Sequence, residues 1–185
     1  MRKSMLRRKG FTLIELLMAV AILAVLLTLA APSYATLVGR THVRAARSAL
    51  NASLSQGRLA SVSRGMHVVA CPSEGQDGCD RTTRWQHGWI AFVDADRDGE
   101  RSADEPLVVA TQALPDGVAI VTSGGRLDVD FQPDGTAGGS NLSLTICDRA
   151  AGAQAALQLV VSNAGRTRNG APTPEQAEAC LRAAG

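Results

Sequence analysis

From Phe11 to Ala31 the chain reads FTLIELLMAVAILAVLLTLAA, a stretch of 21 residues in which Glu15 is the only charged one. A helix rises about 1.5 Å per residue, so this stretch is long enough to cross the roughly 30 Å hydrocarbon layer of a membrane. We therefore expect a transmembrane helix over residues 11–31.

The residues on the N-terminal side of this stretch predict its orientation. Five of the residues before Gly10 are basic: Arg2, Lys3, Arg7, Arg8 and Lys9. Basic flanks stay preferentially in the cytoplasm, so we expect the chain after about residue 32 to lie outside it. Cysteines in such an oxidising compartment are more often paired than free.

A cleaved secretory signal peptide is the alternative, because Ser33-Tyr34-Ala35 could serve as its cleavage site. Two features argue against it. The apolar run is longer than the roughly 7 to 15 residues of a usual signal-peptide core. An acidic residue such as Glu15 is also costly inside a membrane unless it has a function.

Residues 9–15, KGFTLIE, resemble the class III signal of type IV pilins and type II secretion pseudopilins. The resemblance implies an inner-membrane protein whose leader, residues 1–10, is removed by prepilin peptidase after Gly10, with methylation of the new N-terminal Phe11. It also implies that Glu15 neutralises the N-terminal ammonium of an adjoining subunit in a filament, and that Pro32 is the family's helix-kinking proline. A buried charge is tolerable when it is paired in this way.

The helical pattern continues beyond residue 32. Apolar or small residues recur near 3.6-residue spacing at Leu37, Val38, Ala45, Ala49, Leu50, Leu54, Ala60 and Ser61. Gly65 is a plausible stop. We expect one helix from about 13 to 64, with residues 32–64 as its amphipathic continuation.

Seven short β-rich runs follow, separated by glycine, proline and aspartate: 67–71, 88–94, 106–114, 118–123, 126–132, 141–148 and 155–162. They predict a β-rich domain over residues 65–162, outside the cytoplasm. The tail, residues 163–185, is polar and expected to be mostly irregular, with a possible short helix over 174–181. The fold class expected is α+β, with a long N-terminal helix packed on antiparallel sheets.

Residues 85–94, WQHGWIAFVD, resemble the W-x-x-G-W-x-x-F-x-D signature of the GspH/FimT branch of minor pilins. The later GRTR at residues 165–168 narrows the resemblance to FimT-type minor pilins. That branch implies a pilin-like helix on a β-sandwich. It also implies a subunit of a type IV pilus that contacts other pilins and inner-membrane lipid and binds double-stranded DNA during uptake for natural transformation. The alternative is a structural, GspH-like pseudopilin of a type II secretion system that acts only through protein contacts.

A DNA site would have to be local, because the chain after Lys9 has 14 basic and 17 acidic residues, a formal charge of −3. Gly165, Arg166 and Arg168 are the predicted site. They lie among small polar residues, which should leave both guanidinium groups exposed and able to bind phosphates in a bidentate way. We expect a mobile arm, tethered at Cys180.

Residues 94–105 satisfy the calcium-loop pattern D-x-D-x-D-G-x5-E. In a calcium site Asp94, Asp96, Asp98 and Glu105 would supply side-chain oxygens, and Glu100 its carbonyl. However, the loop follows a β-run, and Pro106 would break an exiting helix. A solvated connecting loop is therefore the favoured interpretation, and no other cofactor is expected.

Four cysteines allow three pairings. We favour Cys71 with Cys79, which bracket a turn-like segment, and Cys147 with Cys180, which would pin the tail to the sheets. A zinc site that combines Cys71 and Cys79 with His67 or His87 has no matching module spacing, and the compartment favours disulfides.

Enzyme chemistry has no support in the sequence: it contains no nucleophile elbow, phosphate loop or dinucleotide fingerprint, and its three histidines have no catalytic or metal-ligand spacing. We therefore expect a protein that is not an enzyme. Trp85 and Trp89 are expected to pack in the domain rather than stack on bases. Arg40, Arg44 and Arg47 share a helix face and are expected to contact lipid headgroups or neighbouring subunits rather than DNA.

Overall fold

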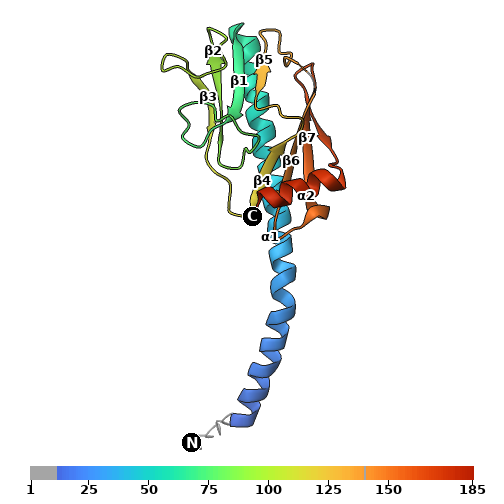
Figure 1. Ribbon diagram of the computed structural model, residues 1–185. Coiled ribbons are helices and arrows are strands. Elements are labelled where there is room, and N and C mark those ends of the chain that lie inside the picture. The colour runs from blue at the N-terminus through green and yellow to red at the C-terminus, as the bar shows by residue number, and fades with distance from the viewer. Residues whose placement is uncertain (1–11, 140) are drawn as a thin grey trace, which may run out of the picture. The chain divides into compact units, whose positions relative to one another are not determined.

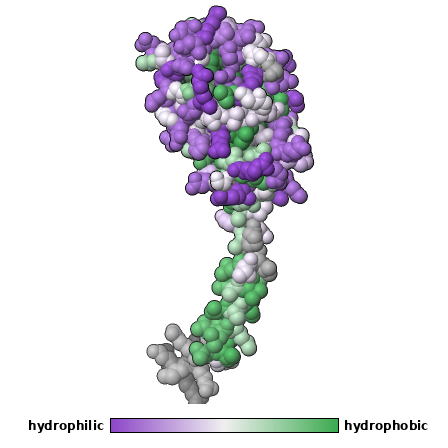
Figure 2. Space-filling view, in the orientation of Figure 1, coloured by the Kyte–Doolittle hydropathy of each residue, from purple (hydrophilic) through white to green (hydrophobic). Residues whose placement is uncertain are grey.

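A computed structural model describes residues 12–139 and 141–185 of the chain. Two compact units are distinguished, Met1–Ala35 and Thr36–Gly185. The first unit is helical from Leu13, and every side chain described in it is exposed. Figure 2 shows an apolar surface along this helical stretch and a largely polar surface on the second unit. By length and composition, helix α1 (Leu13–Arg64) is able to cross a membrane.

Within the second unit, α1 buries one stripe of side chains. Val43, Ala46, Leu50 and Leu54 are at most 4% exposed and recur every three to four residues, as expected for an amphipathic helix. The sequence analysis assigned this face only in part, because Leu37, Ala45 and Ala49 are exposed. Alanines occur on both sides of the helix, so their apolar character alone could not indicate which face packs.

Two four-stranded antiparallel sheets follow α1 (Figure 1). The first has the order β3-β2-β1-β5, with β1 at His67–Pro72, β2 at Trp89–Asp94, β3 at Leu107–Thr111 and β5 at Val129–Phe131. The second has the order β4-β6-β7-β8, with β4 at Val118–Thr122, β6 at Leu142–Asp148, β7 at Leu157–Val161 and β8 at Thr167–Gly170. The fold class is the expected one, a helix packed on antiparallel sheets.

The inner faces of both sheets and the buried stripe of α1 form one core, which includes Trp85 and Trp89 with no exposed surface. The two tryptophans are therefore packing residues, as expected. Strand side chains alternate between faces, and part of each outer face is also covered. Helix α2 (Pro174–Ala183) covers Ala119 and Cys147 of the second sheet, and Cys79 packs on the outer face of the first.

The C-terminal tail differs from the expected irregular segment. Residues Thr167–Gly170 form β8, an edge strand that pairs with β7 from Gln158↔Gly170 to Val161↔Thr167. The segment has no apolar residue, so no periodicity indicated a strand; the open edge of β7 provides the pairing. The short helix expected over residues 174–181 is α2. Its first turn is capped by Thr173, whose hydroxyl accepts from the Gln176 N–H.

Candidate nucleic-acid interface

The predicted arginine motif lies in the β7–β8 hairpin. The Gly165 N–H donates to the Ser162 carbonyl at 2.8 Å, and the Ser162 N–H donates to the Arg166 carbonyl at 2.9 Å. The Ser162 hydroxyl donates to the same carbonyl at 3.1 Å. A tight, braced turn therefore places Arg166 directly before β8 and Arg168 within it. This corrects the expectation of a mobile arm, because backbone pairing holds both residues.

Two features require a glycine at position 165: the backbone conformation of this turn and the closeness of Gly135. Its φ of +69° is in the left-handed region, and a Cβ on it would overlap the carbonyl oxygen of Gly135. Gly135 was not singled out from the sequence as part of the site. Its Pro133-Asp134-Gly135 turn signal was visible there, but no local pattern connects that turn with a glycine thirty residues later.

The hairpin register places Arg168 on the outer face of the second sheet, and Arg166 directly precedes the paired strand. Arg168 lies opposite Val160, and Val160 alternates with Leu159 and Val161, which point into the core. Directly opposed residues share a face, as do residues two apart on one strand. Both arginine side chains are exposed. Neither makes an ion pair or hydrogen bond with any residue in the described ranges.

Charge is unevenly distributed along the chain. Residues 36–64 contain five arginines and no acidic residue, and residues 136–185 contain four arginines and three acidic residues. Residues 65–135 contain 13 acidic and five basic residues. The acidic groups therefore belong mainly to the first sheet and its loops. Arg40 and Arg44 are exposed and Arg47 is half-buried on α1.

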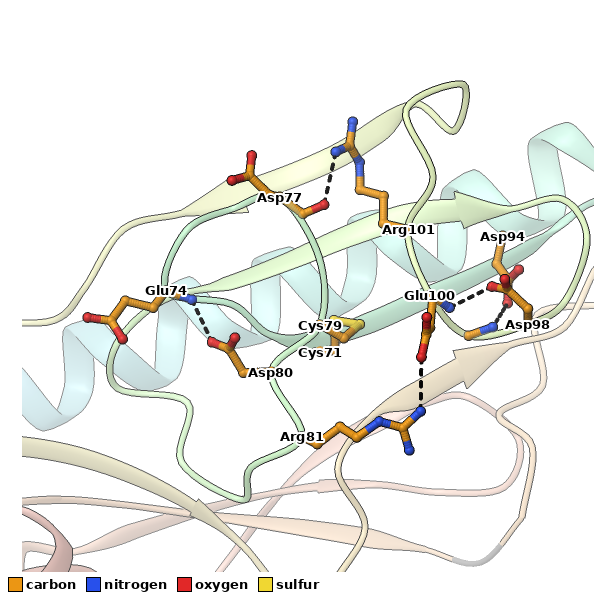
Figure 3. The surroundings of a disulfide bond; sticks show 11 residues. Cys71, Glu74, Asp77, Cys79, Asp80, Arg81, Asp94, Asp98, Glu100 and Arg101 are labelled. Carbon is orange, nitrogen blue, oxygen red and sulfur yellow. Dashed lines mark hydrogen bonds and ion pairs between the residues drawn. A yellow bond between two sulfur atoms is a disulfide. The ribbon is translucent and has the colours of Figure 1, made fainter.

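Acidic side chains from the loops of the first sheet, among them Glu74, Asp80 and Glu100, lie around the Cys71–Cys79 disulfide (Figure 3). Arg81 Nη2 lies 3.0 Å from Glu100 Oε1, and Arg101 Nη1 donates to the Asp77 carbonyl at 3.2 Å. These contacts join the disulfide loop to the loop of residues 94–105. The Glu100 side chain is thus an ion-pair partner of Arg81.

Three of the predicted calcium ligands come together. Carboxylate oxygens of Asp94, Asp96 and Asp98 lie within 4.8 Å of one another. Each also accepts a backbone N–H within its own loop. Glu105 is outside that group; its carboxylate accepts from the Ala95 and Ser102 N–H groups at 2.7 and 3.0 Å. Hydrogen bonds within the loop account for the arrangement of these carboxylates.

The pKa of Asp94 in this loop is raised. Burial raises the pKa of Asp94 above its ordinary value of 3.8, against the opposing effect of hydrogen bonds from the Arg97 and Gly99 N–H groups. The nearby charges of Glu105 and Asp98 raise it further. The ionised form is therefore disfavoured in the folded protein.

Both cysteine pairs are the ones favoured from the sequence. Cys71 and Cys79 form one disulfide, and Cys147 and Cys180 form the other. The second joins β6 to α2 and so fixes the segment that follows β8. A disulfide at Cys71 and Cys79 leaves no free thiolate there for the zinc alternative.

The N-terminal processing residues, Gly10 and Phe11, lie outside the described residues. Glu15 is exposed in the first turn of α1, and its N–H donates to the Thr12 hydroxyl at 3.3 Å.

Parts of the chain match known protein families. Residues 46–165 match the family described as type II transport protein GspH, and residues 5–31 match the prokaryotic N-terminal methylation motif. The GspH match ends at Gly165, so Arg166 and Arg168 lie beyond it. No curated protein matches the chain at a significant level.

Two solved structures share the fold. The type IV minor pilin FimU of Pseudomonas aeruginosa (strain PAO1) is 19% identical with a TM-score of 0.57, over 74% of this chain and 92% of FimU. The minor pseudopilin EpsH of the Vibrio cholerae type 2 secretion system is 11% identical with a TM-score of 0.52, over 71% and 98%. The GspH match spans more than half of the chain, and the methylation motif and the fold agree with it. The chain therefore belongs to the GspH family and is a type IV minor pilin or pseudopilin, anchored by its apolar N-terminal helix.

Proposed function

We propose that this protein is a minor pilin of a type IV pilus that binds double-stranded DNA through its β7–β8 hairpin during DNA uptake for natural transformation. The observation that carries the proposal is the pair of exposed guanidinium groups of Arg166 and Arg168, neither of which has a partner in the described part of the chain. Arg168 lies in the edge strand β8 and Arg166 directly before it, and residues 136–185 contain three acidic residues.

The chemistry of this pair suits the DNA backbone rather than the bases. A guanidinium group can donate two parallel hydrogen bonds to a phosphate, and phosphate contacts carry no sequence information. With about two to four phosphates neutralised, the slope of log K against log salt is expected to be roughly −2 to −4 for duplex DNA. Binding should therefore be modest, independent of sequence and sensitive to salt.

The test compares two double variants of the full chain in a non-ionic detergent. Arg166→Gln with Arg168→Gln should abolish binding in a fluorescence anisotropy titration with duplex DNA, and should abolish transformation. The fold should survive, because both side chains are exposed and neither makes a hydrogen bond or ion pair with another described residue. Arg40→Gln with Arg44→Gln removes the same charge from exposed positions on α1 and should bind as the wild type does. Unchanged binding by the hairpin variant would exclude these arginines as the site.

We also propose that prepilin peptidase cleaves after Gly10, that Phe11 becomes the methylated N-terminus, and that Glu15 pairs with the N-terminal ammonium of an adjoining pilin. In this proposal, inner-membrane lipid surrounds the helix of residues 11–31, and the β-rich domain of residues 65–162 is periplasmic. The N-terminal methylation match at residues 5–31, the five basic residues before Gly10 and the two disulfides support it.

A structural pseudopilin of a type II secretion system is the second candidate, favoured by the printed description of the matching family. Such a subunit has no evident need for two unpaired arginines on a braced turn. Wild-type protein that fails to bind DNA, together with a secretion defect in a deletion strain, would select this candidate. Neighbouring genes of pilus or secretion type would separate the two independently.

A further inference from the structure

We infer that Arg58 of α1 is a positioning residue for the β7–β8 hairpin, holding the turn of residues 133–136 in the place where that turn supports Gly165. Its importance for DNA rests on the proposed function, whereas the contact with the hairpin does not.

The first step of the argument is the contact between α1 and the turn. Arg58 Nε donates to the Gly135 carbonyl at 2.8 Å. A Cβ on Gly135 would lie 2.7 Å from Val62 Cγ2 and 3.3 Å from Arg58 Nη2. The turn of residues 133–136 thus packs closely against the C-terminal end of α1. The hydrogen bond from Arg58 holds the Gly135 carbonyl in place.

The second step is the contact between the turn and the hairpin. The carbonyl that Arg58 holds is the one that a Cβ on Gly165 would overlap, and that Cβ would also lie 3.0 Å from Arg58 Nε. One residue past the turn, the Ala137 N–H donates to the Asn163 carbonyl at 2.9 Å. Two backbone segments distant in sequence therefore meet, and the guanidinium group of Arg58 lies at their junction.

The third step separates positioning from direct phosphate contact. Arg58 is half-buried, and its Nε is already engaged. Asp134 lies beside it: the pKa of that exposed carboxyl is lowered, chiefly by hydrogen bonds from Thr136, and the charge of Arg58 acts in the same direction. A phosphate that approached Arg58 would be repelled by this carboxylate. We therefore assign phosphate contact to Arg166 and Arg168, and support of the hairpin to Arg58.

The experiment uses the full chain in detergent, with Arg58→Met, Arg58→Lys and the matched control Arg44→Met on the exposed face of the same helix. Methionine keeps the aliphatic stem but removes the donors; lysine keeps a donor and the charge. The first readout is hydrogen exchange at the Gly165 and Arg166 amides, without DNA. Arg58→Met should exchange faster there by about tenfold, the change that corresponds to one lost hydrogen bond. Arg58→Lys should recover part of the protection, and Arg44→Met should match the wild type.

The second readout is the salt dependence of duplex DNA binding. Arg58→Met should weaken binding without changing the slope of log K against log salt, because no phosphate contact is lost. A slope shallower by about 0.9 would overturn the inference, since Arg58 would then neutralise a phosphate itself. Unchanged amide exchange in Arg58→Met would equally overturn it. If Arg58→Met does not fold, Arg58→Lys decides the question: faster exchange than in the wild type at the Gly165 and Arg166 amides supports the inference, and unchanged exchange overturns it.

These outcomes distinguish the inference from the proposed function. Wild-type protein that does not bind DNA would contradict the proposed function alone. The exchange rates of Gly165 and Arg166 would still show whether Arg58 holds the hairpin.

Discussion

Gly165 is subject to two independent constraints, which a matched pair of substitutions can separate. Its φ of +69° costs an L-residue about 1 to 2 kcal/mol, and a Cβ would overlap the Gly135 carbonyl oxygen. Gly124 has a similar φ of +75°, but a Cβ there meets nothing within 4 Å. Gly165→Ala should therefore lower the free energy of unfolding more than Gly124→Ala, as measured by urea denaturation. Equal losses would show that the hairpin moves away from Gly135 at no cost.

The raised pKa of Asp94 predicts how the free energy of unfolding depends on pH. Its pKa is raised in the folded protein by burial, so the folded state holds this proton more tightly than the unfolded chain does. As the pH rises above the ordinary value of 3.8, ionisation of Asp94 costs stability in the wild type. Asp94→Asn carries no such cost. The difference in unfolding free energy between variant and wild type should therefore shift in favour of the variant between about pH 3 and pH 7.

Urea denaturation across this pH range, without added calcium, provides the measurement. Asp104→Asn removes an exposed carboxylate of the same loop and is the control. A pH profile for Asp94→Asn that parallels that of Asp104→Asn would show that burial of Asp94 does not affect stability. The same titrations can include calcium: the calcium interpretation of residues 94–105 requires about 1 mM calcium to raise the Tm of the wild type, and an unchanged Tm would contradict it.

At the scale of elements, the two disulfides should contribute different amounts to the free energy of unfolding. Cys71–Cys79 closes a loop of 8 residues on the first sheet, whereas Cys147–Cys180 closes one of 33 and joins α2 to β6. Loop entropy predicts about 2.5 kcal/mol for the shorter loop and about 3.7 kcal/mol for the longer. Replacing Cys147 and Cys180 by alanine should therefore cost more stability than replacing Cys71 and Cys79, as measured by urea denaturation. The opposite order would mean that α2 is held mainly by its own packing.

The edge strand β8 has no apolar residue to pack in the hydrophobic core. Its two ends are tied to other elements, one by the turn at Gly165 and the other through α2 and Cys180. Its arginines also suit an edge position, because charged side chains discourage pairing with strands of other molecules. Pairing with β7 therefore orders the backbone of the proposed phosphate-binding arginines before DNA binds. Binding then costs less conformational entropy.

At the scale of the whole molecule, the N-terminal motif predicts how the chain is processed before assembly. Mass spectrometry of the mature protein should find a methylated Phe11 as its first residue. Gly10→Leu should leave an uncut precursor, because a bulky side chain would obstruct the peptidase. Glu15→Ala should be cleaved but assemble poorly, since the ammonium of the adjoining subunit would lose its counter-charge. A mature N-terminus near Thr36 would indicate an ordinary signal peptide instead and would contradict this proposal.

Much of the fold could be predicted from local sequence patterns. The apolar run of residues 11–31 and the helical spacing beyond it predict α1, because helix periodicity is visible within a few turns. Seven strands could be predicted from β-branched and apolar runs bounded by glycine, proline and aspartate. The exposed arginines of the candidate site were also visible, because they stand among small polar residues.

Other features depend on contacts between segments that are distant in the chain. The residues of β8 have no strand signal, and they form a strand because β7 leaves one edge unpaired. Gly165 must remain glycine because the Gly135 carbonyl lies against it, and that carbonyl is held by Arg58. Sequence patterns report what a residue prefers locally, whereas close approach and edge pairing depend on which surfaces the packed core brings together. For this reason the sequence could point to Arg166 and Arg168 as candidates, and only the tertiary structure decided that they lie at and within an edge strand whose turn packs against Gly135.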